Sequence, residues 1–199
     1  METNTMTNVG FHSIHLAASQ DITIKKGMSI KCNASFIVND GILYIDSDYS
    51  GITIVLPQIN FEAVEIESEY GSVKCDGVNC KQLSISSAHD VKIDNSHIDE
   101  CEISSEYDSI HIINSRINNA NLSAAHNVSV ELDEFSCIEI ESQYDGVKFI
   151  YNGTQQVNAD CTSEYGTVKA RGVFYGGADC NKRIIITAAH DIRLFSRNK

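Results

Sequence analysis

Tyrosine and histidine recur along this 199-residue chain at a nearly constant interval, and both side chains can do chemistry. The series is Tyr70, His89, Tyr107, His126, Tyr144, Tyr165 and His190, with first steps of 19, 18, 19 and 18 residues. A row of neutral imidazoles can bind metal ions, but tyrosines separate these histidines and phenol is an uncommon ligand. We therefore interpret the series as aromatic stacking that covers the core at a corner of the fold, with a metal row as the alternative.

An acidic or small residue follows each aromatic residue directly. These positions hold Asp90, Asp108, Asn127, Asp145 and Asp191, with Gly71 and Gly166 at the equivalent sites. Asp, Asn and Gly share a tolerance of turn geometry, so the column predicts turns. A row of Ca²⁺ ions is the alternative, because these side chains offer oxygen ligands. The glycine-rich nonapeptide of calcium-binding β-rolls is missing, so we predict neither a metal site nor a cofactor.

Motifs for known reaction types are absent from the sequence. It contains no G-x-S-x-G, no H-E-x-x-H and no P-loop. A carboxylate pair for glycoside hydrolysis can be nominated from 27 acidic residues, but these acids repeat with the fold and none is set apart. We therefore predict no catalytic residues and no enzymatic activity.

The seven cysteines are odd in number, and their spacing matches no zinc pattern. Cys75, Cys101 and Cys161 fall in apolar columns of the repeat, where a thiol acts as a small hydrophobic group. The others, Cys32, Cys80, Cys137 and Cys180, fall at or near turns. We predict free thiols and a reducing, cytoplasmic setting.

The recurring residues are positioned by a repeat in which every second residue before and after the turn is apolar or small. Two columns precede the turn. The first is Val64, Leu83, Cys101, Ala120, Ile138, Ala159, Ile184, and the second is Ile66, Ile85, Ile103, Leu122, Ile140, Cys161, Ile186. A third is small: Ser68, Ser87, Ser105, Ala124, Ser142, Ser163, Ala188. Two columns follow the turn: Val73, Val91, Ile110, Val128, Val147, Val168, Ile192, and Cys75, Ile93, Ile112, Val130, Phe149, Ala170, Leu194. Period-2 alternation places all five columns on one face of stacked strands.

The chain is therefore predicted to be an all-β, single-stranded β-solenoid, either a β-helix or a β-roll, with about nine coils of roughly 18–21 residues. Two earlier segments, from Ile14 and from Leu43, fit the same template, and residues 25–39 form a longer insertion. Two turn types alternate, with five steps from Ser68 to Val73 and four from Ser87 to Val91. A coil of about 37 residues is the alternative, but the same inward columns persist in every unit, which favours the shorter coil.

Outward residues before the turn are acidic in the Tyr-type units and neutral in the His-type units. Glu65 and Glu67 contrast in this way with Ser84 and Ser86. Because neighbouring strands lie about 4.8 Å apart, skipping alternate units separates like charges. The one expected exception is a pair of consecutive Tyr-type units, where Gln143 is expected beside Glu164.

A net charge of −12 and a pI near 4.9 argue against nucleic acid or an anionic membrane as the partner. The N-terminus shows no signal peptide, and no apolar run approaches the roughly 18 residues of a membrane span. We expect a polar N-terminal tail at residues 1–10 and a single solenoid domain at residues 11–199.

Units such as 64–74 and 161–169 resemble the DUF4097 "putative adhesin" β-solenoids, whose repeats run strand, small residue, Gly, then Ile or Val. The resemblance covers most of the chain from Phe61, and more loosely from Phe11. It implies a β-helix or β-roll with a surface or scaffolding role and no catalytic residues to carry over. The turns depart from the family where Gly is replaced by Asp90, Asp108 or Asn127. A more distant similarity is to bactofilins, solenoids that polymerise end to end.

Three functions compete. The first is a non-enzymatic structural or interaction protein that self-associates, as a homo-oligomer or with another protein, through a terminal strand at residues 192–195. Cations at Arg193, Arg197 and Lys199 would then approach an acidic neighbour. The second is a ligand-binding module that presents a flat sheet face to carbohydrate or protein, which requires an exposed aromatic stripe. The third, an enzyme of pectate-lyase type, requires long loops that the repeat does not supply.

Overall fold

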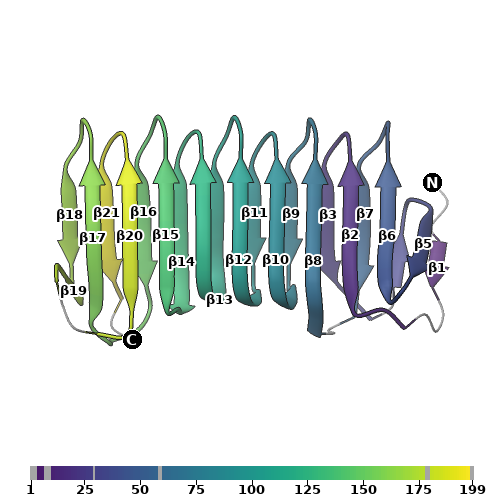
Figure 1. The fold of residues 1–199 in the computed structure, drawn as a ribbon, viewed down its shortest axis with the longest axis horizontal. Helices are drawn as coiled ribbons and strands as arrows, with labels where there is room; N and C mark the ends of the chain where they lie inside the picture. Colours follow the sequence, from purple (N-terminus) through teal and green to yellow (C-terminus); the bar gives the residue numbers. More distant parts are fainter. Residues whose placement is uncertain (1–3, 7–9, 29, 58–59, 178–179, 198–199) are drawn as a thin grey trace.

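A computed structural model of the chain describes residues 4–6, 10–28, 30–57, 60–177 and 180–197. All regular structure in these residues is β-strand, as the sequence predicted, and the strands wind into a flattened solenoid with a front and a back face (Figure 1). The strands of the front face, in spatial order, are β5 (Phe36–Asn39), β6 (Ile42–Ser47), β2 (Ser13–Ala18), β8 (Asn60–Ser68), β10 (Asn79–Ser87), β12 (His97–Ser105), the second part of β13 (Ile110–Ala124), β15 (Cys137–Ser142), β20 (Arg183–Ala188), β17 (Val157–Ser163) and β19 (Phe174–Tyr175).

The back face has the same order, and all of its strands except β1 and β4 follow a turn from a front strand. Its strands are β1 (Asn4–Met6), β4 (Ile30–Cys32), β7 (Ile52–Leu56), β3 (Ile22–Lys26), β9 (Val73–Asp76), β11 (Val91–Asp94), the first part of β13, β14 (Val128–Glu134), β16 (Val147–Tyr151), β21 (Ile192–Ser196) and β18 (Val168–Arg171). Neighbouring coils pair in parallel, with Val64 beside Leu83 and Leu83 beside Cys101. These offsets of 19 and 18 residues confirm the short coil and exclude the 37-residue alternative.

The coils do not stack in sequence order at either end of the solenoid. The first coil, β2–β3, lies between β6–β7 and β8–β9. The last coil, β20–β21, lies between β15–β16 and β17–β18. The expectation of a bare terminal strand at residues 192–195 is therefore wrong, because β21 is paired on both of its edges.

This stacking order makes the two turn types alternate without a break. Along the chain, five-step turns occur consecutively at Ser142 and Ser163, but the four-step turn at Ala188 lies between them in space. Gln143 is consequently not beside Glu164, as the sequence order had suggested, since the coil of β20 separates them. Acidic and neutral outward rows therefore alternate along the whole front face, which keeps like charges two strands apart.

The five predicted columns form the core. Their members are buried in every coil except two. Ser47 is half-buried at the capped end, and in the coil of residues 157–171 Ala159, Cys161 and Ser163 are half-buried while Val168 and Ala170 are exposed. The third column is small because each turn folds back over it. Ser105 Oγ, for example, donates a hydrogen bond of 2.8 Å to the carbonyl oxygen of His89 in the neighbouring turn.

A short third side, which the five columns do not include, closes each coil below the two faces. Val78, Ile98 and Ile117 are buried there. The chain enters this side through a corner with positive φ, 73° at Gly77 and 50° at both Asn95 and Asn114. Glycine and asparagine tolerate this left-handed conformation best, which explains why these residues occupy the corner.

The insertion at residues 25–39 forms a cap on one end of the solenoid. β5 pairs antiparallel with β6, and β4 pairs antiparallel with β7, so both outer strands of that end are covered. Phe36 and Val38 pack against the core beneath the cap. Residues 4–6 of the expected N-terminal tail form β1, which pairs antiparallel with β4.

Candidate functional site

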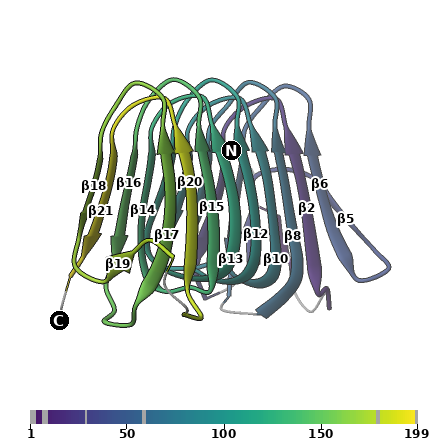
Figure 2. The same ribbon diagram turned by 60° about the vertical axis from the view of Figure 1, so that its left-hand side comes forward.

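The turns that join front and back strands form a row along one edge of the solenoid, which we call the corner ridge (Figure 2). In spatial order it consists of Tyr49, Gln20, Tyr70, His89, Tyr107, His126, Tyr144, His190 and Tyr165. Its tyrosines are between 57% and 93% exposed, so they do not cover the core as predicted. The sequence located the ridge correctly, but it assigned the wrong direction to these side chains.

The side chain of each ridge histidine contacts one neighbouring turn. The rings of His126 and Tyr144 lie 6.0 Å apart between centroids, and His126 Nδ1 lies 3.0 Å from Asp145 Oδ2. His89 repeats both contacts, at 6.3 Å from Tyr107 and 2.8 Å from Asp108 Oδ2. Tyrosines separate the histidines, as the sequence indicated. Among the residues that the structure describes, no three His, Cys, Asp or Glu side chains are grouped so as to hold a metal ion.

The aspartates of the four-step turns hold the neighbouring turn by its backbone. Asp90 Oδ1 accepts a hydrogen bond of 3.1 Å from the Ser109 N–H, and Asp191 Oδ1 accepts one of 3.0 Å from the Thr167 N–H. The Thr167 N–H, followed by Arg193 and the Thr167 hydroxyl, lowers the pKa of Asp191 to about 2. These contacts agree with the turn interpretation of the Asp column.

Close packing between turns explains the glycines of the ridge. A Cβ at Gly71 would lie 2.4 Å from the Asp21 backbone nitrogen, and one at Gly166 would lie 2.4 Å from the His190 carbonyl carbon. Any larger residue with the same backbone would collide with the adjacent coil. The ridge is therefore a tightly stacked support that projects aromatic side chains outward.

Three of the ridge tyrosines have a raised pKa. Hydrogen bonds with the preceding glutamates, Glu69, Glu106 and Glu164, raise the pKa of Tyr70, Tyr107 and Tyr165 above the ordinary value.

Below the ridge, a shallow groove of about 730 Å³ crosses the front face, with Glu65, Glu102 and Glu139 on alternate strands. The groove is open and lined by the repeating acids, and the sequence predicted this alternation.

The end of the solenoid opposite the cap, formed by the coil of residues 157–171, is the second candidate surface, which we call the open end (Figure 2). Its strand β18 pairs only with β21. β17 pairs with β20 on one side, while β19 covers the other side only at Val157 and Asn158. Within the described part of the chain, the outer edges of β18 and of residues 159–163 therefore lack a partner strand. The exposed fraction of Val168 is 45%, although it belongs to a core column.

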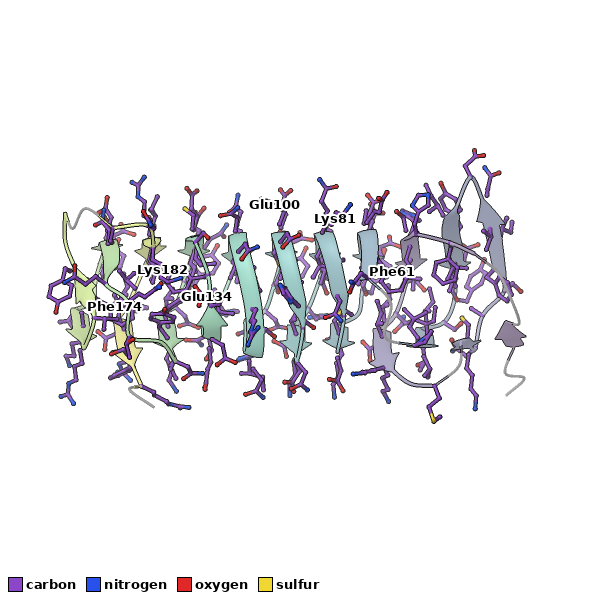
Figure 3. All side chains as sticks on the ribbon, turned by 90° about the horizontal axis from the view of Figure 1, so that it is seen from below. Phe61, Lys81, Glu100, Glu134, Phe174 and Lys182 are labelled. Carbon is purple, nitrogen blue, oxygen red and sulfur yellow. The ribbon has the colours of Figure 1, made fainter. Side chains whose placement is uncertain are left out.

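Lys182 holds the inserted last coil in place from below (Figure 3). Its side chain is only 6% exposed, and its ammonium group donates to Glu134 and to the carbonyl oxygen of Phe135. The same group lies 5.1 Å from the ring centroid of Phe135 and 5.6 Å from that of Tyr151. This cluster was not predicted from the sequence, because Lys182 reaches Glu134 and the Phe135–Tyr151 ring pair only through the coil insertion.

All seven cysteines are free. Cys75 and Cys101 are buried in their predicted columns, whereas Cys161 is half-buried because its coil is terminal. Cys32 and Cys80, which were expected at turns, are buried instead because they belong to the cap and the third side. Burial raises the pKa of Cys161 to about 11 and that of Cys80 to about 12.

Taken together, parallel coils, inward ladders and one capped end define a single-stranded β-solenoid. A sequence model of the family described as Toastrack DUF4097 matches residues 12–191. The chain belongs to this family, as its repeat units indicated. No curated protein sequence matches the chain. No helix that is long and apolar enough to cross a membrane occurs among the described residues.

Three solved structures share similarity along nearly their full length. A "putative adhesin" from Bacteroides fragilis is 15% identical with a TM-score of 0.52, covering 97% of this chain and 96% of that one. A "putative cell adhesion protein" from Clostridium sporogenes is 14% identical, with 98% of both chains covered and a TM-score of 0.38. A "putative adhesin" from Parabacteroides merdae is 11% identical, with 96% and 95% covered and a TM-score of 0.46. At these identities, the first similarity supports the fold alone.

Proposed function

We propose that this protein is a non-enzymatic interaction protein that self-associates through the open end of its solenoid. The observation that carries the proposal is the contrast between the two ends. One end is closed by antiparallel strands, while the other exposes Val168 and Ala170 from core columns beside unpaired strand edges. Pairing such an edge with another chain satisfies its N–H and C=O groups and covers the apolar residues.

The C-terminal cations do not support self-association in the way the sequence suggested. Arg197 Nη1 lies 2.7 Å from Glu131 Oε1, and Arg193 Nη2 lies 3.1 Å from Asp191 Oδ2, so both already have partners within the chain. Lys199 lies outside the described residues. The contact that we propose is therefore made by the coil that is terminal in space and not by the end of the chain.

Light scattering coupled to size-exclusion chromatography tests the proposal. We expect the wild type to be a discrete oligomer at high micromolar concentration, and Val168→Asp to be monomeric, because a carboxylate would be buried in the contact. Ser129→Asp, on the back face away from both ends and opposite His111 and Lys148, is the control and should leave the oligomer intact. A wild type that is monomeric at high micromolar concentration in low salt would refute self-association.

The corner ridge supports a second candidate function, a ligand-binding module. Five exposed tyrosines recur on alternate coils, and tyrosine is enriched at binding surfaces because its ring is apolar while its hydroxyl is polar. The "putative adhesin" description of the structural neighbour fits a role in binding. Binding to a carbohydrate array that is lost in Tyr107→Ala/Tyr144→Ala would support this candidate over self-association.

The setting of the protein is part of the same proposal. Seven free thiols, several of them core residues, fit a reducing compartment, and we place the protein in the cytoplasm on that ground. Surface labelling of intact cells that detects the protein would contradict this placement and favour the adhesive role.

A further inference from the structure

We propose that two copies join by their open ends into a closed, two-fold symmetric dimer, in which β17 of each copy pairs antiparallel with β18 of the other. This inference rests on the self-association proposed above. It adds the partner, a second copy of this chain in reversed orientation, and the residues that face each other. It also predicts a dimer where end-to-end polymerisation would give a filament.

The occupied edges of the capped end favour the pairing of like ends. A head-to-tail stack that continues the parallel coils would need to place the open end of one copy against β6 and β7 of the next. The outer edges of those strands already pair with β5 and β4. The outermost coil at the capped end therefore has no free edge to pair with residues 159–163 and β18. A second open end has the same free edges and can pair with them.

Charge selects between the two possible two-fold arrangements. Outward residues of β17 include Asp160, and Glu164 follows the strand, while β18 carries Lys169 and Arg171 outward. A two-fold axis perpendicular to the sheets would place β17 beside its own copy, with acids on both paired strands and no base. An axis parallel to the strands places β17 of one copy beside β18 of the other, with acid next to base. Opposite charges on adjacent strands stabilise a sheet and like charges destabilise it, so the second arrangement is favoured.

The turn fixes the register of this pairing. The chain reverses between Ser163 and Val168, so these residues lie at the same height in the terminal coil. An axis parallel to the strands preserves height, and Ser163 therefore faces Val168 of the second copy. Counting down the strands, Cys161 faces Ala170, and Asp160 faces Arg171. Each inward residue is thus opposite an inward residue, and each outward residue is opposite an outward one. The core columns therefore continue across the dimer, and the acids of β17 lie beside the bases of β18.

The shape of the open end agrees with this arrangement. In Figure 1, β18 lies to the left of β17, with β19 below it, so the upper part of the terminal coil ends in a step. The favoured axis brings the protruding β18 of one copy edge to edge with the recessed β17 of the other, on both faces. The rejected axis would bring the two protruding strands together and hold the two β17 strands apart.

A single cysteine substitution tests the register. Directly opposed residues of antiparallel strands have Cβ atoms close enough for a disulfide with small adjustment. We expect Ala170→Cys to cross-link through the natural Cys161 of the other copy under a mild added oxidant, converting most of the protein to a covalent dimer. The control Cys161→Ser/Ala170→Cys should lose this product. Cross-linking of the wild type through two Cys161 residues would instead indicate the perpendicular axis and overturn the proposal.

A charge exchange provides the second test. Asp160→Arg and Arg171→Asp should each weaken the dimer about tenfold or more, because each places like charges in contact. The double variant Asp160→Arg/Arg171→Asp should restore it, because every contact is again between opposite charges. A wild type that dimerises, with no Ala170→Cys cross-link and no rescue by the double variant, would refute this geometry while leaving self-association in place. A monomeric wild type would refute both.

Discussion

Ser163 Oγ donates a hydrogen bond of 2.8 Å to the carbonyl oxygen of His190, a residue that lies 27 positions later in the chain. In the regular coils the same bond reaches back 16 positions, as from Ser105 to His89. The reversed direction and the longer separation show that the last coil enters the stack one place before the end. This insertion makes residues 157–171 the terminal coil, and the open end follows from it.

Overpacking of the small column should destabilise the solenoid. Ala124 is 1% exposed and lies beneath a turn, so Ala124→Leu forces a larger side chain into filled space. We expect it to lower the free energy of unfolding by about 1–3 kcal/mol, measured by urea denaturation. Ser163→Leu, in the same column at the open end, should cost less. An unchanged midpoint for Ala124→Leu would contradict the register.

Much of the fold is visible in the sequence because local spacing and burial have the same period. The columns, the short coil and the alternating acids all follow from residues such as Val64 and Leu83 recurring at one coil length. The order of the coils is different, because it depends on which strands pair over long distances. A signal exists, however. Two five-step turns in succession, at Ser142 and Ser163, break an alternation that tight stacking requires, and the inserted coil restores it.

The candidate surfaces were only partly predictable for the same reason. The ridge tyrosines repeat with the coil, so their position was correct, but whether a ring at a corner turns inward or outward depends on the space above the core. The open end could not be located without the order of the coils. The cluster around Lys182 likewise could not be predicted, because Lys182 reaches residues 134 and 151, which lie in neighbouring coils, only through the insertion.

Thiol labelling should separate the cysteines by their place in the stack. Cys75 and Cys101 should resist a maleimide until the protein unfolds, because both are buried in internal coils. Cys161 should react in the native monomer, and its rate should rise with pH toward about 11, since burial has raised its pKa. Mass spectrometry of the labelled peptides gives the order of reaction. Faster labelling of Cys101 than of Cys161 would invert the predicted exposure.

Asp191 should make stability depend on acid pH. Its pKa falls from an ordinary value of 3.8 to about 2 in the folded state, so the ionised form favours folding. This stabilisation is complete above about pH 5 and is lost as pH falls through 3.8 toward 2. The difference in melting temperature between wild type and Asp191→Asn should therefore shrink over that window. A difference that stays constant down to pH 2 would show that Asp191 does not act through its charge.

Lys182 should contribute to stability through its stem as well as its charge. Lys182→Ala removes the partner of Glu134 and leaves a cavity beside Phe135, with an expected loss of about 2 kcal/mol or more. Lys182→Met keeps most of the buried volume and should cost less. Urea denaturation of both variants measures the difference. Equal losses would indicate that packing of the stem contributes little.

Amide hydrogen exchange as a function of protein concentration tests self-association through the open end without any substitution. If copies join by their open ends, amides of residues 159–163 and 168–171 gain protection as the concentration rises from low to high micromolar, because new strand pairs form there. Residues 36–39 of the cap, which take no part in the contact, should exchange at the same rate throughout. Protection that does not change with concentration at residues 168–171, or that rises at the cap, would contradict the account.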